Sequence, residues 1–313
     1  DIAKYESGEY PWTHPNTDWF EEALKDYSQS RHHNFSVMGG TRNVTYHGSF
    51  GTQFDDGIYT NSATSYNRYN LKLNLNAKIN EFISIGLDIV GIQENRKYPT
   101  KSASAIYNTG LMRMYPTFHA IFPGTDLPGP DIEYGDQPMV SASDKTGFDD
   151  DKRYRSNNIL SVNFKVPGVN GLELKGYYAY DMYFQNRKLF QKPWVLYTLD
   201  KEAYLAAGNT GKEDGTAFLF SKTIGFPEPR VTNTSYTEDS KTANIKLDYK
   251  NTFNAVHDVD AFIAYEQNEF NSRGWNAFRR FFVSDRLPYL FAGGDAEKNN
   301  ARAATSIFPL RYA

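Results

Sequence analysis

Hydrophobic and polar residues alternate along much of the chain with a period of two. From position 69 onward, Leu71, Leu73 and Leu75 lie on one side of the pattern, and Lys72 and Asn74 lie on the other. Successive side chains of a β-strand point to opposite faces of a sheet, so the alternation predicts strands with one apolar and one wet face. The strands predicted in this way cover residues 33–39, 43–54, 69–79, 83–93, 159–166, 172–184, 242–250 and 259–266.

The connections between the predicted strands are alternately short and long. Short turns are expected at 40–42, 80–81, 167–171 and 254–258. Long segments are expected at 55–65, 94–157, 185–241 and 267–306. Short turns at one end and long loops at the other are typical of outer-membrane barrels. The pattern therefore predicts an all-β fold, a transmembrane antiparallel β-barrel with long extracellular loops. A soluble all-β sandwich or propeller is the alternative.

The polar faces of the predicted strands would line the lumen of this barrel. The residues expected there are Lys72, Asn74, Asn76, Lys78, Asp181, Lys246 and Asp248. About eight strands are too few to enclose such polar side chains, so we expect a wider barrel or a plug. The strand at 33–39 ends in a short turn, and a new alternation begins near residue 309. We therefore expect the barrel to continue beyond both ends of this sequence.

Aromatic residues fall into two groups. The first lies on the apolar faces, where lipid contact and an interfacial girdle are expected; it comprises Tyr46, Tyr69, Tyr178, Tyr180 and Phe184. The second lies in the predicted extracellular loops, and its candidates for contact with a substrate or a partner protein are Trp194, Tyr197, Trp275, Phe281 and Tyr289. Their rigid rings could stack on sugars, bury against a partner, or hold the loops together.

The long segments contain three predicted helices. Asp18, with Glu21 three residues later, has the spacing of a capping box. Asp200 is placed to cap a helix over 201–207 that stops at Gly208. A third helix is predicted over 102–114, ending before a proline.

Composition narrows the class of protein. The chain has 313 residues, a net charge of −3, 0 Cys, 23 Tyr and 22 Phe. Without cysteine there is no disulfide framework or thiolate metal site. Without a clustered basic patch, a nucleic-acid partner is not expected. No apolar run approaches the roughly 18 residues of a transmembrane helix. The chain opens without the charged and apolar regions of a signal peptide.

The chain offers few candidates for catalysis or metal binding. The acidic run 149–151 falls in a predicted loop. A solvated loop is the preferred interpretation, and a Ca²⁺ site, which needs oxygen ligands, is the alternative. His32 and His33 are adjacent, so on a strand they point to opposite faces and make a poor metal site. No phosphate-binding loop, dinucleotide fingerprint, HExxH or nucleophile elbow is present. We expect no catalytic residues, no enzyme activity and no cofactor.

Several segments, in order, resemble one known family. They are Asn16–Glu22, His33–Thr41, Phe54–Ile58 and Tyr66–Leu71, followed by His257–Val259, Tyr265–Gln267, Arg279–Phe281 and Leu287–Pro288. This succession resembles the barrel of the SusC/RagA family of TonB-dependent outer-membrane transporters. The resemblance spans nearly the whole chain. It divides the chain into an extracellular loop with a short helix, 1–32, and a barrel segment of about eight strands plus the start of another, 33–313.

The resemblance implies a barrel of about 22 strands around a plug that is not in this sequence. It further implies active import of a bulky nutrient, an oligosaccharide or alternatively an oligopeptide, across the outer membrane of a Gram-negative bacterium. The implied partners are a SusD-like surface lipoprotein, the TonB–ExbB–ExbD complex and a second transporter–lipoprotein pair. Two alternatives remain from the residues alone. One is a soluble glycan-binding protein or glycoside hydrolase, and the other is a passive porin or surface adhesin.

Overall fold

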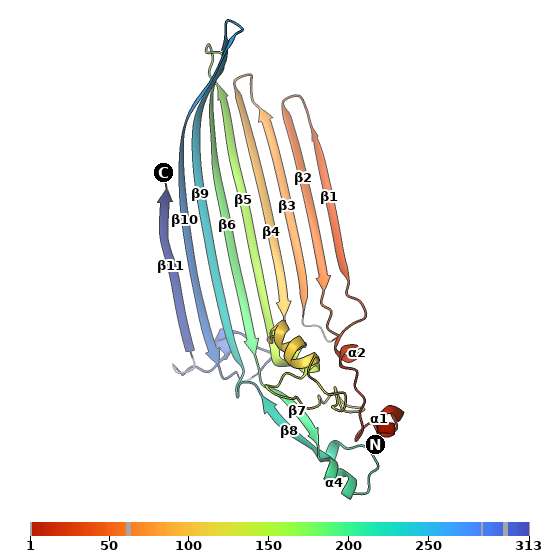
Figure 1. Ribbon diagram of the computed structural model, residues 1–313. Coiled ribbons are helices and arrows are strands. Elements are labelled where there is room, and N and C mark those ends of the chain that lie inside the picture. The colour runs from red at the N-terminus through yellow and green to blue at the C-terminus, as the bar shows by residue number, and fades with distance from the viewer. Residues whose placement is uncertain (1, 61–63, 283, 297–299, 313) are drawn as a thin grey trace.

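The computed structural model describes residues 2–60, 64–282, 284–296 and 300–312. Within them the main element is one nine-stranded sheet, in which every neighbouring pair is antiparallel and the order is β1-β2-β3-β4-β5-β6-β9-β10-β11. The long strands lie side by side in a curved layer, and the helices gather at one end of it (Figure 1). The all-β antiparallel prediction is confirmed.

The elements have these bounds. The strands of the main sheet are β1 (Ser30–Gly40), β2 (Val44–Asp56), β3 (Ser65–Lys78), β4 (Ile83–Tyr98), β5 (Gly147–Lys165), β6 (Leu172–Gln191), β9 (Arg230–Phe253), β10 (His257–Arg280) and β11 (Asn300–Tyr312). A separate hairpin consists of β7 (Trp194–Leu199) and β8 (Leu219–Ile224). The helices are α1 (Ile2–Ser7), α2 (Trp19–Ala23), η1 (Ala105–Leu111), α3 (Pro138–Ser141), η2 (Asp144–Thr146), α4 (Lys201–Ala206), η3 (Thr216–Phe218) and η4 (Leu290–Ala292).

The predicted alternation of connections is confirmed. Short turns join β1 to β2, β3 to β4, β5 to β6 and β9 to β10, all at one end of the sheet, and the long connections lie at the other (Figure 1). Local hydrogen bonds close these turns. The Asn80 side chain accepts the N–H groups of Phe82 and Ile83 at 2.8 Å each. Asn254 and Ala255 have positive φ angles of 53° and 58°, the left-handed pair that a tight hairpin with right-twisted strands requires.

The strands extend much further toward the long connections than predicted. β4 continues to Tyr98 rather than 93, β5 begins at Gly147 rather than 159, and β9 begins at Arg230 rather than 242. In these extensions both faces carry polar residues, so the period-two contrast disappears although the backbone pairing continues. The predicted long loops at 94–157, 185–241 and 267–306 are accordingly shorter, and part of each belongs to the sheet.

The connections at the long-loop end pack into a layer with its own small cores. Trp12 stacks on Phe122 with ring centroids 5.6 Å apart, and Tyr204 is buried in the same cluster. Trp19 donates its indole N–H to the carbonyl of Tyr115 at 2.9 Å. The segment before β1, the connection after β4 and the β7–β8 region are therefore joined by contacts between residues about 100 positions apart and more.

Two of the predicted helices are present and the third differs. Asp18 Oδ1 accepts the N–H groups of Phe20 and Glu21 and caps α2. Asp200 accepts the N–H of Ala203 at 3.0 Å and caps α4. The segment predicted as a helix over 102–114 is instead a short π-helix, η1. Its buried Ile106 and Leu111 are five positions apart, a spacing that the i→i+5 hydrogen bonding of a π-helix matches. None of the helices in the described ranges is long and apolar enough to span a bilayer.

Candidate functional site: the polar face of the sheet

The strand register assigns the predicted lumen residues to one face of the sheet. Lys78 is opposite Ser84 and continues across the sheet through Asn163 and Lys175 to Lys246. Directly paired residues of antiparallel strands point to the same face. By the same register, all seven predicted lumen residues, Lys72, Asn74, Asn76, Lys78, Asp181, Lys246 and Asp248, share this polar face. The opposite face carries the leucine, isoleucine and tyrosine positions of the alternation.

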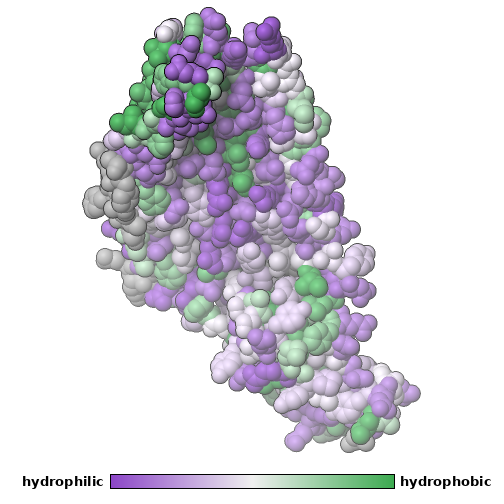
Figure 2. Space-filling view, turned by 45° about the horizontal axis from the view of Figure 1, so that its top comes forward, coloured by the Kyte–Doolittle hydropathy of each residue, from purple (hydrophilic) through white to green (hydrophobic). Residues whose placement is uncertain are grey.

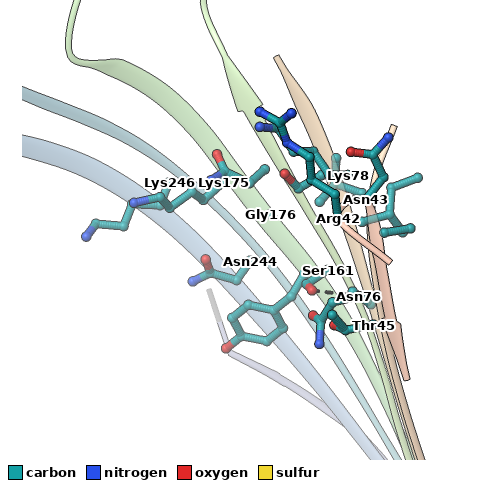
Figure 3. A pocket seen from close by; sticks show the side chains of 17 residues that line it. Arg42, Asn43, Thr45, Asn76, Lys78, Ser161, Lys175, Gly176, Asn244 and Lys246 are labelled. Carbon is teal, nitrogen blue, oxygen red and sulfur yellow. Dashed lines mark hydrogen bonds between the residues drawn. The ribbon is translucent and has the colours of Figure 1, made fainter. Parts of the chain in front are cut away.

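A broad depression of about 610 Å³ lies on the polar face at the short-turn end. It crosses from the β1–β2 turn to β9 (Figure 3), and its polar lining includes Asn76, Lys78, Lys175, Tyr177, Asn244 and Lys246. In the space-filling view, hydrophilic residues cover much of the strand region (Figure 2). Three of the predicted lumen residues therefore line one hollow.

Asp248 links two of the lysines of this depression. Its carboxylate lies 2.7 Å from Lys246 Nζ and 2.9 Å from Lys175 Nζ, and the residue is only 5% exposed. Lys175 also lies 3.2 Å from a carboxylate oxygen of Glu173. These four charges therefore offset one another across β6 and β9.

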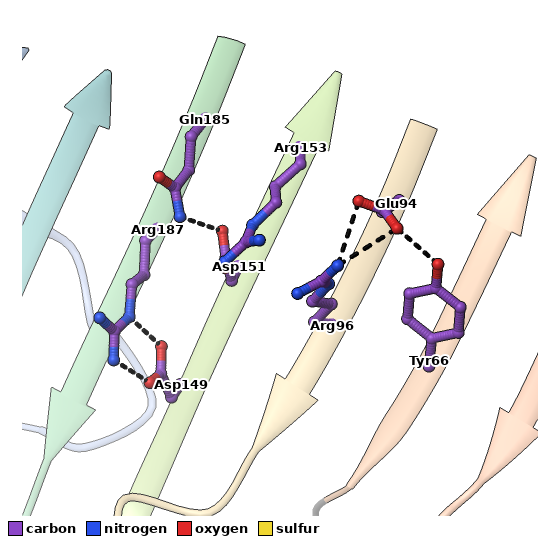
Figure 4. Close-up of polar contacts among 8 residues, drawn as sticks. All are labelled: Tyr66, Glu94, Arg96, Asp149, Asp151, Arg153, Gln185 and Arg187. Atoms are coloured by element: carbon purple, nitrogen blue, oxygen red, sulfur yellow. Dashed lines mark hydrogen bonds and ion pairs between the residues drawn. The ribbon is translucent and has the colours of Figure 1, made fainter. Parts of the chain in front are cut away.

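A second set of polar contacts lies on the same face near the long-loop end (Figure 4). The Glu94 carboxylate accepts the hydroxyl of Tyr66 at 2.5 Å and the guanidinium of Arg96 at 3.2 Å. Tyr66 comes from β3 and the other two from β4, so the contact joins neighbouring strands side by side. Arg96 also lies over the Tyr66 ring, 5.6 Å from its centroid.

The acidic run Asp149–Asp151 belongs to this network, and its predicted place in a loop was wrong. Asp149 accepts two hydrogen bonds from Arg187, at 2.8 and 2.5 Å, and Asp151 accepts from Arg153 and Gln185 at 2.8 Å each. Asp149 is 8% exposed and Asp151 is 4% exposed. Strand β5 accommodates three consecutive carboxylates because the first and third are neutralised on the polar face.

The middle carboxylate of the run points to the other face. Asp150 is aligned in the register with Lys97 of β4 and Lys188 of β6. In the described part of the chain, no group of three or more histidine, cysteine or acidic residues has the arrangement of a metal site.

The five predicted loop aromatics lie in different places. Trp194 and Tyr197 are in β7, and Tyr197 packs beside the Trp12 cluster. Trp275 lies within β10 rather than in a loop, on the face opposite to the lumen candidates, since β10 extends to Arg280. Phe281 follows β10 directly with a φ of 60°. Tyr289 stacks on Phe291 with centroids 5.7 Å apart. The structure does not bring the five residues into one site.

Trp194, one of these five, lines a pocket at the long-loop end. The pocket has a volume of about 390 Å³ and also contains Thr100, Lys101 and Gln191. Lys101 Nζ lies 5.2 Å from the centroid of the Trp194 ring. Gln191 is paired with Gly147 in the register, four residues beyond Arg187 on the same strand. The pocket therefore continues the polar face from the ion-pair network into the loop layer.

The residues of the ion-pair network were not predicted from the alternation of apolar and polar positions. Arg96, Arg153 and Arg187 lie where the apolar alternation has ended, so the strands carrying them were cut short. A usable signal was present nonetheless. Charged residues of opposite sign recur at every second position in Glu94–Arg96 and Asp151–Arg153, the spacing at which neighbours share a strand face.

Comparison with known proteins gives a likeness of fold. No protein-family model matches the chain, and no curated protein matches it by sequence. Solved structures of the RagAB peptide importer do match. The closed-closed state aligns with a TM-score of 0.66 and 17% identity over 95% of this chain, and the open-open state with 0.67 and 17% over 93%. The chain spans about 30% of the length of these matched chains. These neighbours are transporters and not enzymes.

Proposed function

We propose that the chain is part of a TonB-dependent outer-membrane transporter that imports a bulky nutrient. The long connections face the outside and the short turns face the periplasm. The polar face forms part of the wall along which the substrate passes, and the apolar face contacts lipid. The role of the named polar residues is passage and support for a plug, not catalysis.

The observation that carries this proposal is the exposure of the apolar face. Phe35 is 70% exposed, Leu71 51%, Ile245 58% and Ile263 71%, and all four lie on that face by the register. A continuous apolar surface across so many strands is abnormal for a protein surrounded by water. In lipid it is favourable, and a tilted strand needs only about 9–11 residues to cross the hydrocarbon. This disfavours the soluble glycan-binding or hydrolase alternative.

The height of the apolar band supports the orientation. On β4 it runs from Ile83 to Gly91, and Gln93 and Asn95 follow on the same face. The strands therefore extend beyond the hydrocarbon on the side of the long connections. The paired charges of Glu94 and Arg96 lie in this extension, at the level of the outer vestibule in our proposal.

The fold likeness supports the proposed lipoprotein partner, and the substrate class is part of the proposal. RagAB is a peptide importer, and the resemblance of the sequence to SusC/RagA adds a SusD-like lipoprotein that closes the outer mouth. We further propose TonB–ExbB–ExbD as the energy source, a dimer of transporter–lipoprotein pairs, and a substrate that is an oligosaccharide or an oligopeptide. Trp194, beside Lys101 in the loop-end pocket, is the aromatic residue best placed to contact it.

The test is uptake by cells that carry the full-length protein. Labelled oligosaccharides and oligopeptides are offered with TonB present or deleted, and captured protein is examined for a bound lipoprotein. Asn76→Trp, which fills the depression, should lower uptake. Leu75→Trp, its neighbour on the lipid face, should not. Uptake that persists without TonB would replace the active importer by a passive porin, and binding to the surface without uptake would favour an adhesin.

A further inference from the structure

A second hollow lies on the apolar face, near the end of the apolar band that is closer to the long connections. It is a groove of about 350 Å³ whose lining includes Phe50, Tyr69, Leu71, Gly91, Tyr154 and Met182. A Cβ placed on Gly91 would meet no other atom within 4 Å. The missing side chain at this position therefore leaves open space between apolar neighbours.

Lysines occupy the rows of the sheet just beyond this groove. Gln93 and Tyr154 of one row are followed on the same face by Asn95 and Lys152. In the next row Lys97, Asp150 and Lys188 are aligned across β4, β5 and β6. Successive rows are about 7 Å apart along the strands. The cationic rows therefore begin one step outside the groove, on the side of the long connections.

The protein offsets the charge of these three lysines only in part, through Asp150. Among the described residues, no ion pair is formed by Lys97, Lys152 or Lys188, and Lys97 and Lys152 are exposed. Lys188 Nζ lies 3.8 Å from the centroid of the Tyr289 ring. Asp150 supplies one carboxylate against three ammonium groups. The patch therefore favours an anionic group held next to the apolar groove.

We propose that the groove and the lysines form a binding site for a phosphorylated acyl lipid of the outer leaflet. An acyl chain lies in the groove over Gly91, and the phosphate lies among Lys97, Lys152 and Lys188. The inference rests on the proposed function in one respect, namely that the long connections face outward. A free anion would use the lysines but not the groove, and a neutral lipid would use the groove but not the lysines.

The experiment measures lipid retention by the full-length protein purified from outer membranes. The protein is incubated with phosphatidylglycerol, phosphatidylcholine or inorganic phosphate and analysed by native mass spectrometry. One variant combines Lys97→Gln, Lys152→Gln and Lys188→Gln, with Lys222→Gln on β8 as the charge control. A second variant, Gly91→Leu, fills the groove, with Gly48→Leu elsewhere on the same face as its control.

The expected result is preferential retention of phosphatidylglycerol by the unaltered protein and both controls. In the lysine variant, the retention of phosphatidylglycerol should fall by a factor of about five for each lysine removed. Its retention of phosphatidylcholine should not change. Gly91→Leu should lower the retention of both lipids. If the lysine variant retained as much phosphatidylglycerol as the unaltered protein, the proposal would be overturned. It would also be overturned if the protein bound inorganic phosphate but no lipid, and if Gly91→Leu left that phosphate binding intact.

Membrane fractionation and uptake are measured on the same preparations. A protein that reaches the outer membrane and imports its substrate, but retains no anionic lipid, would overturn only the lipid site. A protein absent from the outer membrane would overturn the proposed function itself.

Discussion

Arg187 of β6 and Asp149 of β5 form a two-point contact, with Nε and Nη2 of the arginine donating to the two carboxylate oxygens at 2.8 and 2.5 Å. Asp149 is nearly buried, whereas about half of the Arg187 side chain is exposed. The parallel pair of hydrogen bonds fixes both orientation and charge. It explains how an acidic run can form part of a strand at the level where the apolar band has ended.

The first prediction concerns this pair. Arg187→Met should lower the free energy of unfolding by about 1–3 kcal/mol, because it leaves the Asp149 carboxylate without its charged partner. Thermal or urea unfolding of the full-length protein in detergent measures the change. Lys212→Met removes an exposed pair with Glu9 and should leave the free energy of unfolding almost unchanged, because water screens an exposed ion pair. Adding Asp149→Asn to Arg187→Met should restore part of the loss, and a loss that stays complete would contradict the pairing.

The second prediction tests the assignment of the two faces. Leu73→Arg places a charge on the lipid face and should cost about 2–4 kcal/mol at mid-bilayer depth, so the yield of assembled barrel in the outer membrane should fall. Lys72→Arg, its neighbour on the polar face, should assemble normally. The measurement is the amount of folded barrel in outer membranes, seen as the band whose mobility changes when the sample is boiled before electrophoresis. If Leu73→Arg assembles as well as Lys72→Arg, the faces are reversed.

The third prediction is a pH dependence of the loop layer. His119 is largely buried, stacks on Phe122 and has its Nε2 2.8 Å from the carbonyl of Pro11. Burial, with a smaller contribution from the Lys201 charge, lowers the pKa of His119 below its usual 6.5. When the packing around His119 opens, the imidazole binds a proton more readily than when it is packed. The contribution of neutral His119 to the stability of the packing is therefore fully present above about pH 6.5 and is lost as the pH falls below it.

The backbone amides of residues 116–122 should therefore be less protected from hydrogen exchange at about pH 5 than at about pH 7.5, after correction for the intrinsic pH dependence of exchange. His119→Asn should abolish the difference between the two conditions. The exposed His33, on β1, provides the matched control, because His33→Gln should respond like the unaltered protein. An equal response in His119→Asn would assign the effect to another group.

The fourth prediction concerns the turn after α4. Hydrogen bonds from the Thr210 and Gly211 N–H groups and the Thr210 hydroxyl, with the Thr210 backbone contribution first, lower the pKa of Glu213 from 4.5 to about 2. A lowered carboxyl pKa stabilises the turn above pH 4.5, and this stabilisation is lost as the pH falls from 4.5 to about 2. Glu213→Gln should open the turn already at neutral pH, measured by the rate of proteolysis within 208–214. Glu202→Gln on α4 is the control, and identical rates for the two variants would contradict the prediction.

Much of the architecture follows from the sequence alone. The alternation around Leu73 and Lys72 is a local property, because each strand residue points opposite to its neighbours whatever the rest of the chain does. It predicted the two faces, the hairpins and the alternation of short and long connections. It also placed Asn76, Lys78 and Lys246 on the face that carries the depression. The caps formed by Asp18 and Asp200 were equally predictable, since their hydrogen bonds reach only two or three residues ahead.

Only the tertiary structure decided the rest, because it depends on partners distant in sequence. The strand extensions around Arg96 and Arg187 carry no apolar contrast, and pairing with the neighbouring strands is what holds them in the sheet. Asp149 becomes acceptable in a strand only through Arg187, 38 positions away. Trp275 joined the sheet for the same reason, and the loop layer around Trp12 and Phe122 formed from segments that no local pattern connects. Alternation therefore determined the faces of the sheet, whereas long-range pairing determined how far the strands extend and which charges meet on them.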